Sequence, residues 1–510
     1  MSIRVVFRVD ANAEIGTGHL MRCLALAAEL RRQGAQCAFV CRGAGLEKTA
    51  PRITQEGHEL LTLPKTTGFN ADGLAHSSWL PGGWRNDADA SRAALAGRPR
   101  ADWLIVDHYA LDARWQGALR DVAGRIMVID DLADRDHDCD LLLDQNLPGP
   151  NDRRYADHVP TACATLLGPR YALLREEFAA HRKTALATEN AEPRLLILFG
   201  GADAQDLSGR CVDLLGRKGF QGHVDVIAGP LYLLVEPLAE RLAALPSATL
   251  HRQPSEVAAI MAGADLALGS PGVSSWERCT LGLPTLAIAV ADNQEPQGEV
   301  LARAGAIAYL GRAPDVSEAA LETALDHLLG NPWARKHMRQ MAADICDGLG
   351  CRRVARRLLG VGLSLRRAEA EDARPVFAWR NDDRVRRYSL DPSPLDLERH
   401  LAWFQRSLTD PARALLIAVF DSTPVGCLRF DFQEASARVS IFLDPERTGA
   451  GFATPILEAS ETWLRRERPD ILALQAEILE ANVASQRSFL AAGYRPAHTV
   501  FFKKLSAPEN

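Results

Sequence analysis

The sequence predicts an α/β protein with two similar parallel-sheet halves, followed by a third and smaller domain. Short apolar strand candidates alternate with helical patterns up to about residue 350, which is typical of parallel sheets covered by helices. The alternation restarts near residue 192, and a new set of strands begins at residue 363. A length of 510 residues also suits about three domains of ~150 residues each. We therefore expect domains at residues 1–180, 192–358 and 363–506.

Composition excludes several classes of protein. Acidic and basic residues, 65 and 59 in number, are interspersed and leave a net charge of −6, so nucleic acid and membrane surfaces are not expected partners. The ten cysteines are scattered without CxxC pairs, which indicates reduced thiols and no metal site. No apolar run approaches the ~18 residues of a membrane span, and no signal peptide is recognisable. We expect a cytoplasmic protein.

The first half is organised around the motif Gly16-Thr17-Gly18-His19. It separates a buried strand at residues 3–10 from a helix at residues 20–32. Glycines let a backbone approach a ligand, and the first N–H groups of a helix leave partial positive charge there. A second positive charge is disfavoured at this point, so His19 suits the role of a neutral general base. The alternative is a helix-capping loop with an incidental histidine.

Further strand candidates in this half lie at residues 37–41, 103–106, 126–129 and 141–143, with helical patterns at 93–95 and 113–122. Three of the strands run into acids, namely Asp107, Asp130-Asp131 and Asp144. Because the carboxyl ends of parallel strands border the ligand crevice, we expect these acids near His19, unless each caps the next helix. Residues 68–86 are predicted as a long loop over the crevice, in which Trp79 and Trp84 anchor the loop or contact ligand.

The second half follows a polar stretch at residues 181–192. Its first strand, 195–199, enters a glycine turn at Gly200-Gly201, and further strands are predicted at 224–228, 266–268 and 284–290. Two such halves with a cleft between them form the GT-B geometry of nucleotide-sugar enzymes. Residues 269–277 place small and hydroxyl side chains, among them Val273, Ser274 and Ser275, at a helix start, which suits a diphosphate. Glu277 then either accepts hydrogen bonds from a ribose diol or complements the helix dipole, and Asn293-Gln294 follow the last strand.

Seven motifs of residues 3–357 together resemble the nucleotide-sugar hydrolases of pseudaminic acid biosynthesis: IGTGHLMRCLALA, VDHY, IDDLADRDHDCD, LLGPRYALLREEF, FGGAD, SSWERCTLGLP and ADNQ. The resemblance implies a GT-B-like pair of Rossmann-type domains that hydrolyses UDP-2,4-diacetamido-2,4,6-trideoxy-β-L-altropyranose to UDP and the free sugar. It also implies that His19 and Asn293 are catalytic. Pro271 departs from the family, whose members have a small residue there.

The expected mechanism is attack of a water, activated by His19, at the anomeric carbon opposite UDP, which gives inversion. Asp10 is a hypothetical partner that orients His19 or binds sugar. The residues expected to bind substrate are Asp10, Gly16, Gly18, Arg22, Gly200, Gly201, Val273, Ser274, Ser275, Glu277 and Gln294.

The third domain begins with a strand near residue 363, and later strands are predicted at 415–420, 425–430 and 439–443. A GxG turn at 449–451 then leads into a helix and is a plausible pyrophosphate cradle. Residues 449–454, together with Asn482-x-x-Ser485 and Gly493-Tyr494, resemble the α+β GNAT acetyltransferases. The WRND segment and residues 400–404 resemble amino-sugar N-acetyltransferases of the same pathway. The residues expected to bind acetyl-CoA are Arg447, Gly449, Gly451, Phe452, Ala453, Thr454, Asn482 and Ser485.

The two resemblances imply consecutive steps of one pathway. The acetyltransferase would acetylate UDP-4-amino-4,6-dideoxy-N-acetyl-β-L-altrosamine with acetyl-CoA as cosubstrate, and the hydrolase would cleave the product. Other enzymes of the pathway are expected partners. Phe489 stands where many GNAT enzymes have a tyrosine that protonates the CoA thiolate. The alternative is a GT-B glycosyltransferase fused to a protein N-acetyltransferase or to a silent CoA-binding domain.

Overall fold

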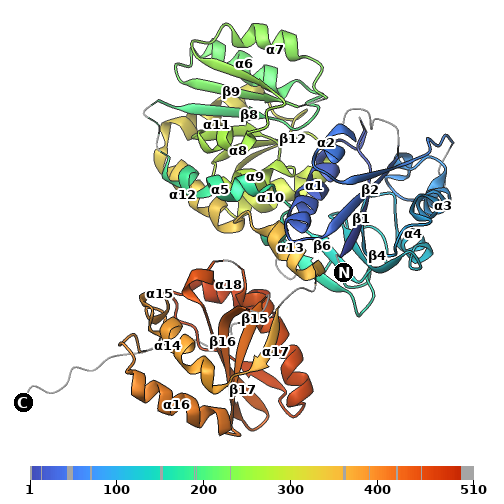
Figure 1. Cartoon of the computed structure of the whole chain (residues 1–510). Helices are drawn as coiled ribbons and strands as arrows, with labels where there is room; N and C mark the ends of the chain where they lie inside the picture. The colour runs from blue at the N-terminus through green and yellow to red at the C-terminus, as the bar shows by residue number, and fades with distance from the viewer. Residues whose placement is uncertain are drawn as a thin grey trace, which may run out of the picture. The chain divides into compact units, whose positions relative to one another are not determined.

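The computed structural model describes residues 3–12, 14–42, 50–68, 72–149, 153–188, 190, 192–229, 231–359, 363–389, 391–420, 423–449 and 451–495. The chain forms two compact units, Met1–Leu359 and Gly360–Asn510 (Figure 1). The first unit contains two sheets and the second contains one. The predicted end of the third domain at residue 506 lies outside the described residues, and the three predicted domain boundaries stay predictions.

The first sheet has seven parallel strands in the order β3-β2-β1-β4-β5-β6-β7. The strands are β1 (Arg4–Val9), β2 (Gln36–Arg42), β3 (Glu59–Leu63), β4 (Ala101–Asp107), β5 (Ala123–Ile129), β6 (Leu141–Asp144) and β7 (Ala164–Leu167). The helices are α1 (Gly18–Arg32), α2 (Ala50–Gln55), α3 (Gly83–Leu95) and α4 (Ala113–Ala118), with a 3-10 turn η2 (Ser77–Trp79). β1 and β4 are buried over almost their whole length, as expected for central strands of a parallel sheet.

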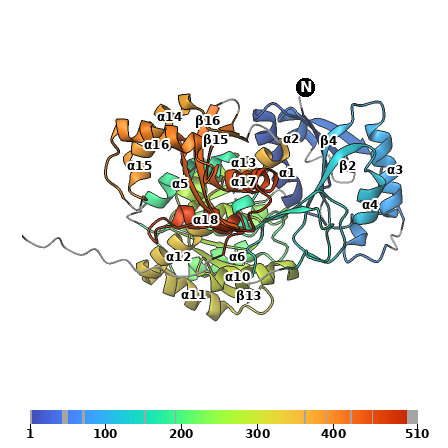
Figure 2. The same cartoon turned by 90° about the horizontal axis from the view of Figure 1, so that it is seen from below.

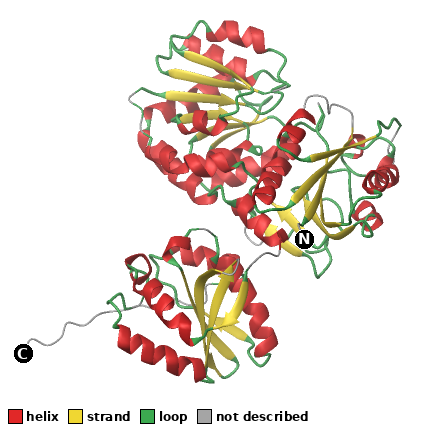
Figure 3. Cartoon of the chain, viewed as in Figure 1, coloured by secondary structure: helices red, strands yellow, loops and turns green. Residues whose placement is uncertain are grey.

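The second sheet repeats this plan with six parallel strands in the order β10-β9-β8-β11-β12-β13. They are β8 (Arg194–Leu198), β9 (His223–Ala228), β10 (Ala248–Arg252), β11 (Leu266–Gly269), β12 (Thr285–Ala289) and β13 (Ala308–Arg312). The helices are α5 (Glu176–Ala187), α6 (Leu207–Arg217), α7 (Val235–Leu242), α8 (Val257–Ala262), α9 (Ser274–Leu281), α10 (Glu295–Arg303), α11 (Glu318–Gly330), α12 (Pro332–Ile345) and α13 (Gly350–Leu359), with 3-10 turns η3 (Pro169–Tyr171) and η4 (Asp292–Gln294). Helices cover both faces of the sheet (Figure 3).

The last helix of this unit returns to the first half. α13 packs against α1, and the two lie side by side in both views (Figures 1 and 2). The indole Nε1 of Trp103, in β4, donates a hydrogen bond of 2.6 Å to the carbonyl oxygen of Leu358. The chain therefore leaves the unit from the first half and not from the second.

One sequence-based expectation in this unit was wrong in extent. The predicted loop at residues 68–86 contains η2 and the first turn of α3, which begins at Gly83; residues 69–71 lie outside the described residues. The polar stretch at 181–192 is helical up to Ala187, because α5 continues through it. Its polar side chains form the outer face of a helix whose Phe178 and Ala185 are buried, and composition alone does not separate such a face from a linker.

The second unit is an α+β sheet in the order β14-β15-β16-β17-β18. Its elements are β14 (Ser364–Arg367), β15 (Arg413–Phe420), β16 (Thr423–Gln433), β17 (Ser436–Leu443) and β18 (Ala473–Gln475), with helices α14 (Ala373–Asn381), α15 (Asp383–Arg386), α16 (Leu397–Thr409), α17 (Ala453–Glu467) and α18 (Val483–Ala491) and 3-10 turns η5 (Ala370–Asp372) and η6 (Pro445–Arg447). The first four strands are antiparallel. β18 pairs in parallel with only the first three residues of β17, and the rest of β17 pairs with β16 alone.

Candidate functional site

The predicted site residues of the first unit gather where the strand order reverses in each sheet. In the first sheet β1 and β4 are neighbours; residues 16–19, the histidine turn, follow β1, and Asp107 closes β4. In the second sheet β8 and β11 are neighbours; Gly200 follows β8, and residues 270–275, the serine turn, follow β11. Such switch points are where open α/β sheets bind ligands.

Local hydrogen bonds shape the histidine turn. The Oδ1 of Asn12 accepts from the backbone N–H groups of Glu14 and Ile15, at 2.9 and 2.8 Å. The N–H of Gly16 donates to the carbonyl of Asn12 at 2.8 Å, and Gly16 has φ +78°, which a glycine adopts without steric cost. The helix α1 then begins at Gly18, so His19 stands in its first turn.

His19 is held by a buried carboxylate from the neighbouring strand. The Nδ1 of His19 lies 2.6 Å from the Oδ1 of Asp107. The Nε and Nη2 of Arg22 donate to the same carboxylate, each at 2.6 Å. Burial raises the pKa of Asp107, but the contacts with Arg22 and His19 outweigh burial and hold it well below its usual range. An ionised carboxylate only accepts hydrogen bonds, so Nδ1 carries the proton and Nε2 is left as the basic nitrogen.

Aromatic rings enclose the imidazole. Tyr109 and Trp79 meet the ring of His19 edge-on, at centroid distances of 4.7 and 5.7 Å, and they stack on each other at 5.1 Å. The Tyr109 hydroxyl donates to Asp131. Trp79 is thus anchored to the body of the protein beside His19. Trp84 lies in α3 and contacts the guanidinium groups of Arg85 and Arg114.

Two expected substrate contacts have other roles. Asp10 does not orient His19, because both of its oxygens face Arg8 at 2.6 and 2.8 Å, and it also contacts the N–H of Arg42 and the ring of His108. Arg22 is only 2% exposed and donates to Asp107 and Asp131. Its guanidinium therefore supports the histidine turn from inside the sheet and is not available to a substrate.

The histidine turn faces both turns of the second half. A Cβ added at Gly18 would lie 3.9 Å from the Cγ2 of Val273, and one at Gly201 would lie 3.7 Å from the Oγ1 of Thr17. Gly200, with φ +86°, turns the chain at the end of β8. The structure thus brings together the histidine turn, the Gly200-Gly201 turn and the serine turn. These are the three glycine or serine segments of this unit for which the sequence predicts a chemical role.

The amides that follow β12 differ in their surroundings. The Oε1 of Gln294 accepts from the backbone N–H of Val290 at 3.0 Å, and its Nε2 would lie 3.4 Å from a Cβ added at Gly272. Gln294 therefore lies against the serine turn. Asn293 is exposed, in η4, and its side chain makes no hydrogen bond to another described residue.

Glu277 stands in the first turn of α9. Its half-buried carboxylate makes no hydrogen bond or ion pair within the described part of the chain. Burial raises its pKa to about 7; the charges of Arg175 and Arg278 oppose this shift and that of Glu177 adds to it. An unpaired carboxylate at the rim of the serine turn can accept hydrogen bonds from a ligand.

Arg278 is a site residue that sequence reasoning missed. It is 1% exposed, and its guanidinium donates to the carbonyl of Ser270 at 2.6 Å and to the hydroxyls of Ser274 and Ser275 at 3.0 and 3.1 Å. The spacing of Ser274 and Arg278 by four residues on one helix face was the available signal.

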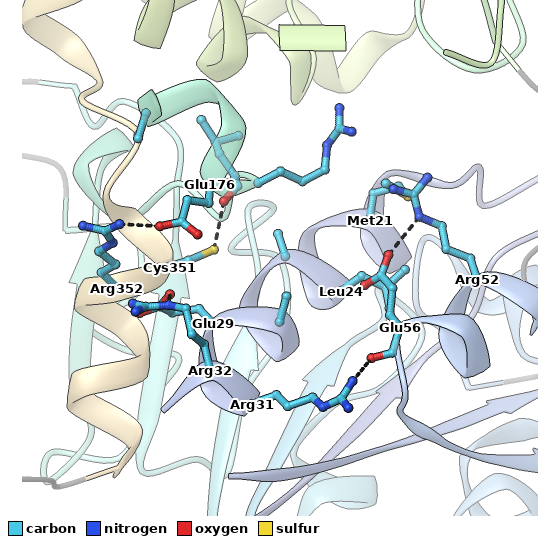
Figure 4. Close-up of a pocket in the computed structure, with 16 residues that line it drawn as sticks. Met21, Leu24, Glu29, Arg31, Arg32, Arg52, Glu56, Glu176, Cys351 and Arg352 are labelled. Carbon is cyan, nitrogen blue, oxygen red and sulfur yellow. Dashed lines mark hydrogen bonds and ion pairs between the residues drawn. The ribbon is translucent and has the colours of Figure 1, made fainter. Parts of the chain in front are cut away.

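A separate pocket of about 590 Å³ opens between α1, α2, α5 and α13 (Figure 4). It contains none of the predicted site residues. Its floor is apolar, with Leu24 and Ala28 among others, and its rim carries paired charges such as Arg52 with Glu56 and Arg352 with Glu176. Four of the five arginines that line the pocket are paired with acids, and Arg31 donates to the backbone carbonyl of Glu56.

In the second unit, the predicted cradle follows β17. Gly449 and Gly451 have φ +79° and +80°, Arg447 is exposed, and α17 begins at Ala453 after the N-cap residue Phe452. Phe452 and Thr454 are 2% and 3% exposed, so their side chains are buried and a ligand at the turn would meet their backbone groups. Residue 450 lies outside the described residues.

The second signature of this unit is a helix cap. The Oδ1 of Asn482 accepts from the N–H of Ser485 at 3.1 Å at the start of α18, which by itself explains the N-x-x-S spacing. Contacts of Asn482 and Ser485 with acetyl-CoA stay predictions. Phe489 is 5% exposed and packs edge-on against Tyr494 at 4.9 Å, and the Tyr494 hydroxyl is buried without a hydrogen-bond partner in the described chain.

Comparison with curated proteins finds distant relatives. An uncharacterized protein of Methanocaldococcus jannaschii is 20% identical over 430 residues, 79% of this chain and 78% of that protein. The UDP-2,4-diacetamido-2,4,6-trideoxy-beta-L-altropyranose hydrolase of Campylobacter jejuni is 27% identical over 216 residues, 40% of this chain and 63% of the hydrolase. The spore coat polysaccharide biosynthesis protein SpsG of Bacillus subtilis is 22% identical over 37% of this chain and 56% of SpsG. The last two matches span less than two thirds of each relative.

Residues 363–495 match the family model of the acetyltransferase (GNAT) domain. The chain therefore joins a hydrolase-like unit to a GNAT domain. Solved structures give the fold of the hydrolase-like unit. The match to MurG of Acinetobacter baumannii has a TM-score of 0.51 and 15% sequence identity, and it covers 70% of this chain and 100% of MurG. The match to the glycotransferase of kitacinnamycin has a TM-score of 0.50 and 18% sequence identity, and it covers 71% of this chain and 99% of that protein. These likenesses confirm the predicted GT-B-like fold class.

Within the ranges that the structure describes, no group of three or more His, Cys, Asp or Glu side chains could hold a metal ion. None of the described helices is both long and apolar enough to span a bilayer.

Proposed function

We propose that the chain is a bifunctional enzyme of pseudaminic acid biosynthesis. In this proposal the GNAT domain acetylates the 4-amino group of UDP-4-amino-4,6-dideoxy-N-acetyl-β-L-altrosamine, and the hydrolase-like unit cleaves the product to UDP and the free 2,4-diacetamido sugar. The similarity to the Campylobacter hydrolase and the match to the GNAT domain support both halves. The observation that carries the hydrolytic half is the His19–Asp107 pair at the switch point of the first sheet.

In the proposed hydrolysis, a water bound at the Nε2 of His19 attacks the anomeric carbon. The water oxygen forms the new bond, its proton passes to Nε2, and the bond from carbon to the UDP oxygen breaks with its electrons leaving on the diphosphate. The ionised Asp107 stabilises the imidazolium that forms. Attack opposite the leaving group inverts the anomeric centre. The serine turn and the N-terminus of α9 supply donors to the diphosphate as negative charge develops there, and Glu277 accepts from the ribose.

In the proposed acetylation, the 4-amino group attacks the thioester carbonyl of acetyl-CoA. The new C–N bond forms, the C–S bond breaks, and the thiolate takes up a proton. The turn around Gly449 and Gly451 would hold the pyrophosphate by its backbone N–H groups. No metal takes part in either step of the proposal, and the ten free cysteines agree with the reducing cytoplasm that we propose as its location.

The test is NMR of the amino sugar nucleotide incubated with the full chain and acetyl-CoA. We expect UDP and free diacetamido sugar from the wild type. With His19→Ala we expect the acetylated UDP-sugar to accumulate, because UDP release should fall by about 10³- to 10⁴-fold while acetylation continues. Acetylation thus serves as an internal control for folding. Release of UDP only when an acceptor alcohol is added would favour a glycosyltransferase instead, and acetylation of peptides but not of the sugar would reassign the GNAT domain.

A further inference from the structure

Arg278 differs from every other buried arginine that the structure describes. Four of these arginines hold carboxylates: Arg8 pairs with Asp10 and Asp87, Arg22 with Asp107 and Asp131, Arg42 with Asp87, and Arg135 with Asp130 and Asp134. Arg278 is as deeply buried but forms no ion pair in the described part of the chain. A buried charge without a counter-charge is costly, so its presence calls for an explanation.

The guanidinium of Arg278 is aimed into the serine turn. Its two terminal nitrogens bind the carbonyl of Ser270 and the hydroxyls of Ser274 and Ser275. Its Nε is buried and has no hydrogen-bond partner among the described residues. A Cβ at Gly269 would lie 2.9 Å from Nη1 of Arg278 and 2.5 Å from the carbonyl oxygen of Leu198, so the glycine admits the guanidinium beneath the turn.

The electrostatics of this position favour an anion on the turn. Burial lowers the pKa of Arg278 to about 10, so the side chain is still charged at neutral pH. The first N–H groups of α9 add partial positive charge at the same place. Ser270 and Ser275 are themselves 3% and 1% exposed, so little water reaches the guanidinium, and a group bound on the turn would feel its charge weakly screened.

We propose that Arg278 is a positioning residue for an anionic ligand group. It fixes the serine turn and supplies the positive charge that neutralises a diphosphate bound there. This inference rests on the proposed function, since the diphosphate is that of the UDP-sugar, and it adds a residue and a physical reason for selectivity towards charged nucleotides. Uridine, which lacks phosphate, should gain nothing from Arg278.

The experiment is titration calorimetry of the full chain with UDP and with uridine. Saturating CoA is present throughout, so that the pyrophosphate cradle of the GNAT domain is occupied. The variants are Arg278→Gln and Arg278→Lys. The matched control is Arg182→Gln. Arg182, like Arg278, forms no ion pair in the described part of the chain; it donates to the backbone carbonyls of Thr280, Ala343 and Cys346 and lies away from the serine turn.

Arg278→Gln should weaken UDP binding by about 10- to 100-fold and uridine binding by less than about twofold. Arg182→Gln should leave the ratio of the two affinities unchanged. An equal loss for UDP and uridine, or no loss for either, overturns the proposal, because a purely structural role would not depend on ligand charge. A wild type that binds no UDP would instead refute the proposed function.

Arg278→Lys keeps the charge and guards against loss of folding in the glutamine variant. Its compact ammonium cannot reach both sides of the turn as the planar fork does, so UDP affinity should fall severalfold with uridine affinity unchanged. If Arg278→Gln does not fold, a lysine variant that loses affinity for uridine as much as for UDP overturns the proposal.

Discussion

The histidine turn, after β1, and the serine turn, after β11, each lie at the switch point of their own sheet, yet their buried charges are balanced differently. At the histidine turn, Arg22 and His19 share the carboxylate of Asp107, and the arrangement is complete within the protein. At the serine turn, Arg278 has no carboxylate and Glu277 has no cation within hydrogen-bonding distance among the described residues. A self-contained network suits a group that must keep one orientation through a reaction. Buried charges without partners suit a binding surface on which a charged ligand supplies the missing partner.

The largest effect should come from breaking the self-contained network. Asp107→Asn removes the charge that fixes the tautomer of His19, and UDP release should fall by about 10³-fold. It also leaves Arg22 underpaired inside the sheet, which should lower the free energy of unfolding by about 3 kcal/mol. Steady-state kinetics and thermal unfolding of the full chain measure the two effects.

Asp87→Asn is the matched control for this prediction. Asp87 is fully buried in the same half and pairs with Arg8 and Arg42, so its loss should cost similar stability without lowering kcat. If both variants lose activity in proportion to stability, Asp107 has no specific role in catalysis.

A smaller effect should appear in the pH dependence of UDP affinity, which probes Glu277 beside the serine turn. Glu277, with a pKa near 7, is mostly protonated at pH 6 and ionised at pH 8, and only the ionised form accepts from both ribose hydroxyls. UDP affinity of the wild type should therefore rise by about tenfold over this range relative to Glu277→Gln. UDP titrates equally in both proteins, so the difference isolates Glu277. Parallel pH profiles would mean that Glu277 serves only the helix dipole of α9.

The smallest effect separates two glycines of the histidine turn. Gly16 has φ +78°, so Gly16→Ala should lower the free energy of unfolding by about 1 kcal/mol. Gly18 has no such φ, and its added Cβ would meet only Val273 at an ordinary contact distance; Gly18→Ala should be neutral for stability and affect substrate binding alone. Thermal unfolding with and without UDP distinguishes them, and equal destabilisation by both would refute the distinction.

The sequence predicts the sheets and turns well because buried strands and glycine turns are local patterns. Each strand that it predicts in the two sheets of the first unit is present. It predicts side-chain partners poorly, because these depend on strand order. Asp10 and Asp107 both stand at strand ends, and only the adjacency of β1 and β4 decides that the second one reaches His19. The four edge strands β3, β7, β10 and β13 are short and partly exposed, and the sequence analysis predicts none of them.

The path of α13 bears on how this gene could have been assembled and how its product can be divided. This helix follows the second half in the sequence, but it packs on the first half, where Trp103 donates a hydrogen bond to the carbonyl of Leu358. It therefore links the two halves of the unit. The second unit begins immediately after it. A cut between residues 359 and 363 would keep α13 attached to the first unit, whereas a cut before Gly350 would remove α13 from it. Separate expression of the two activities therefore has a natural junction, and it coincides with the point where a domain could be gained or lost without disturbing its neighbour.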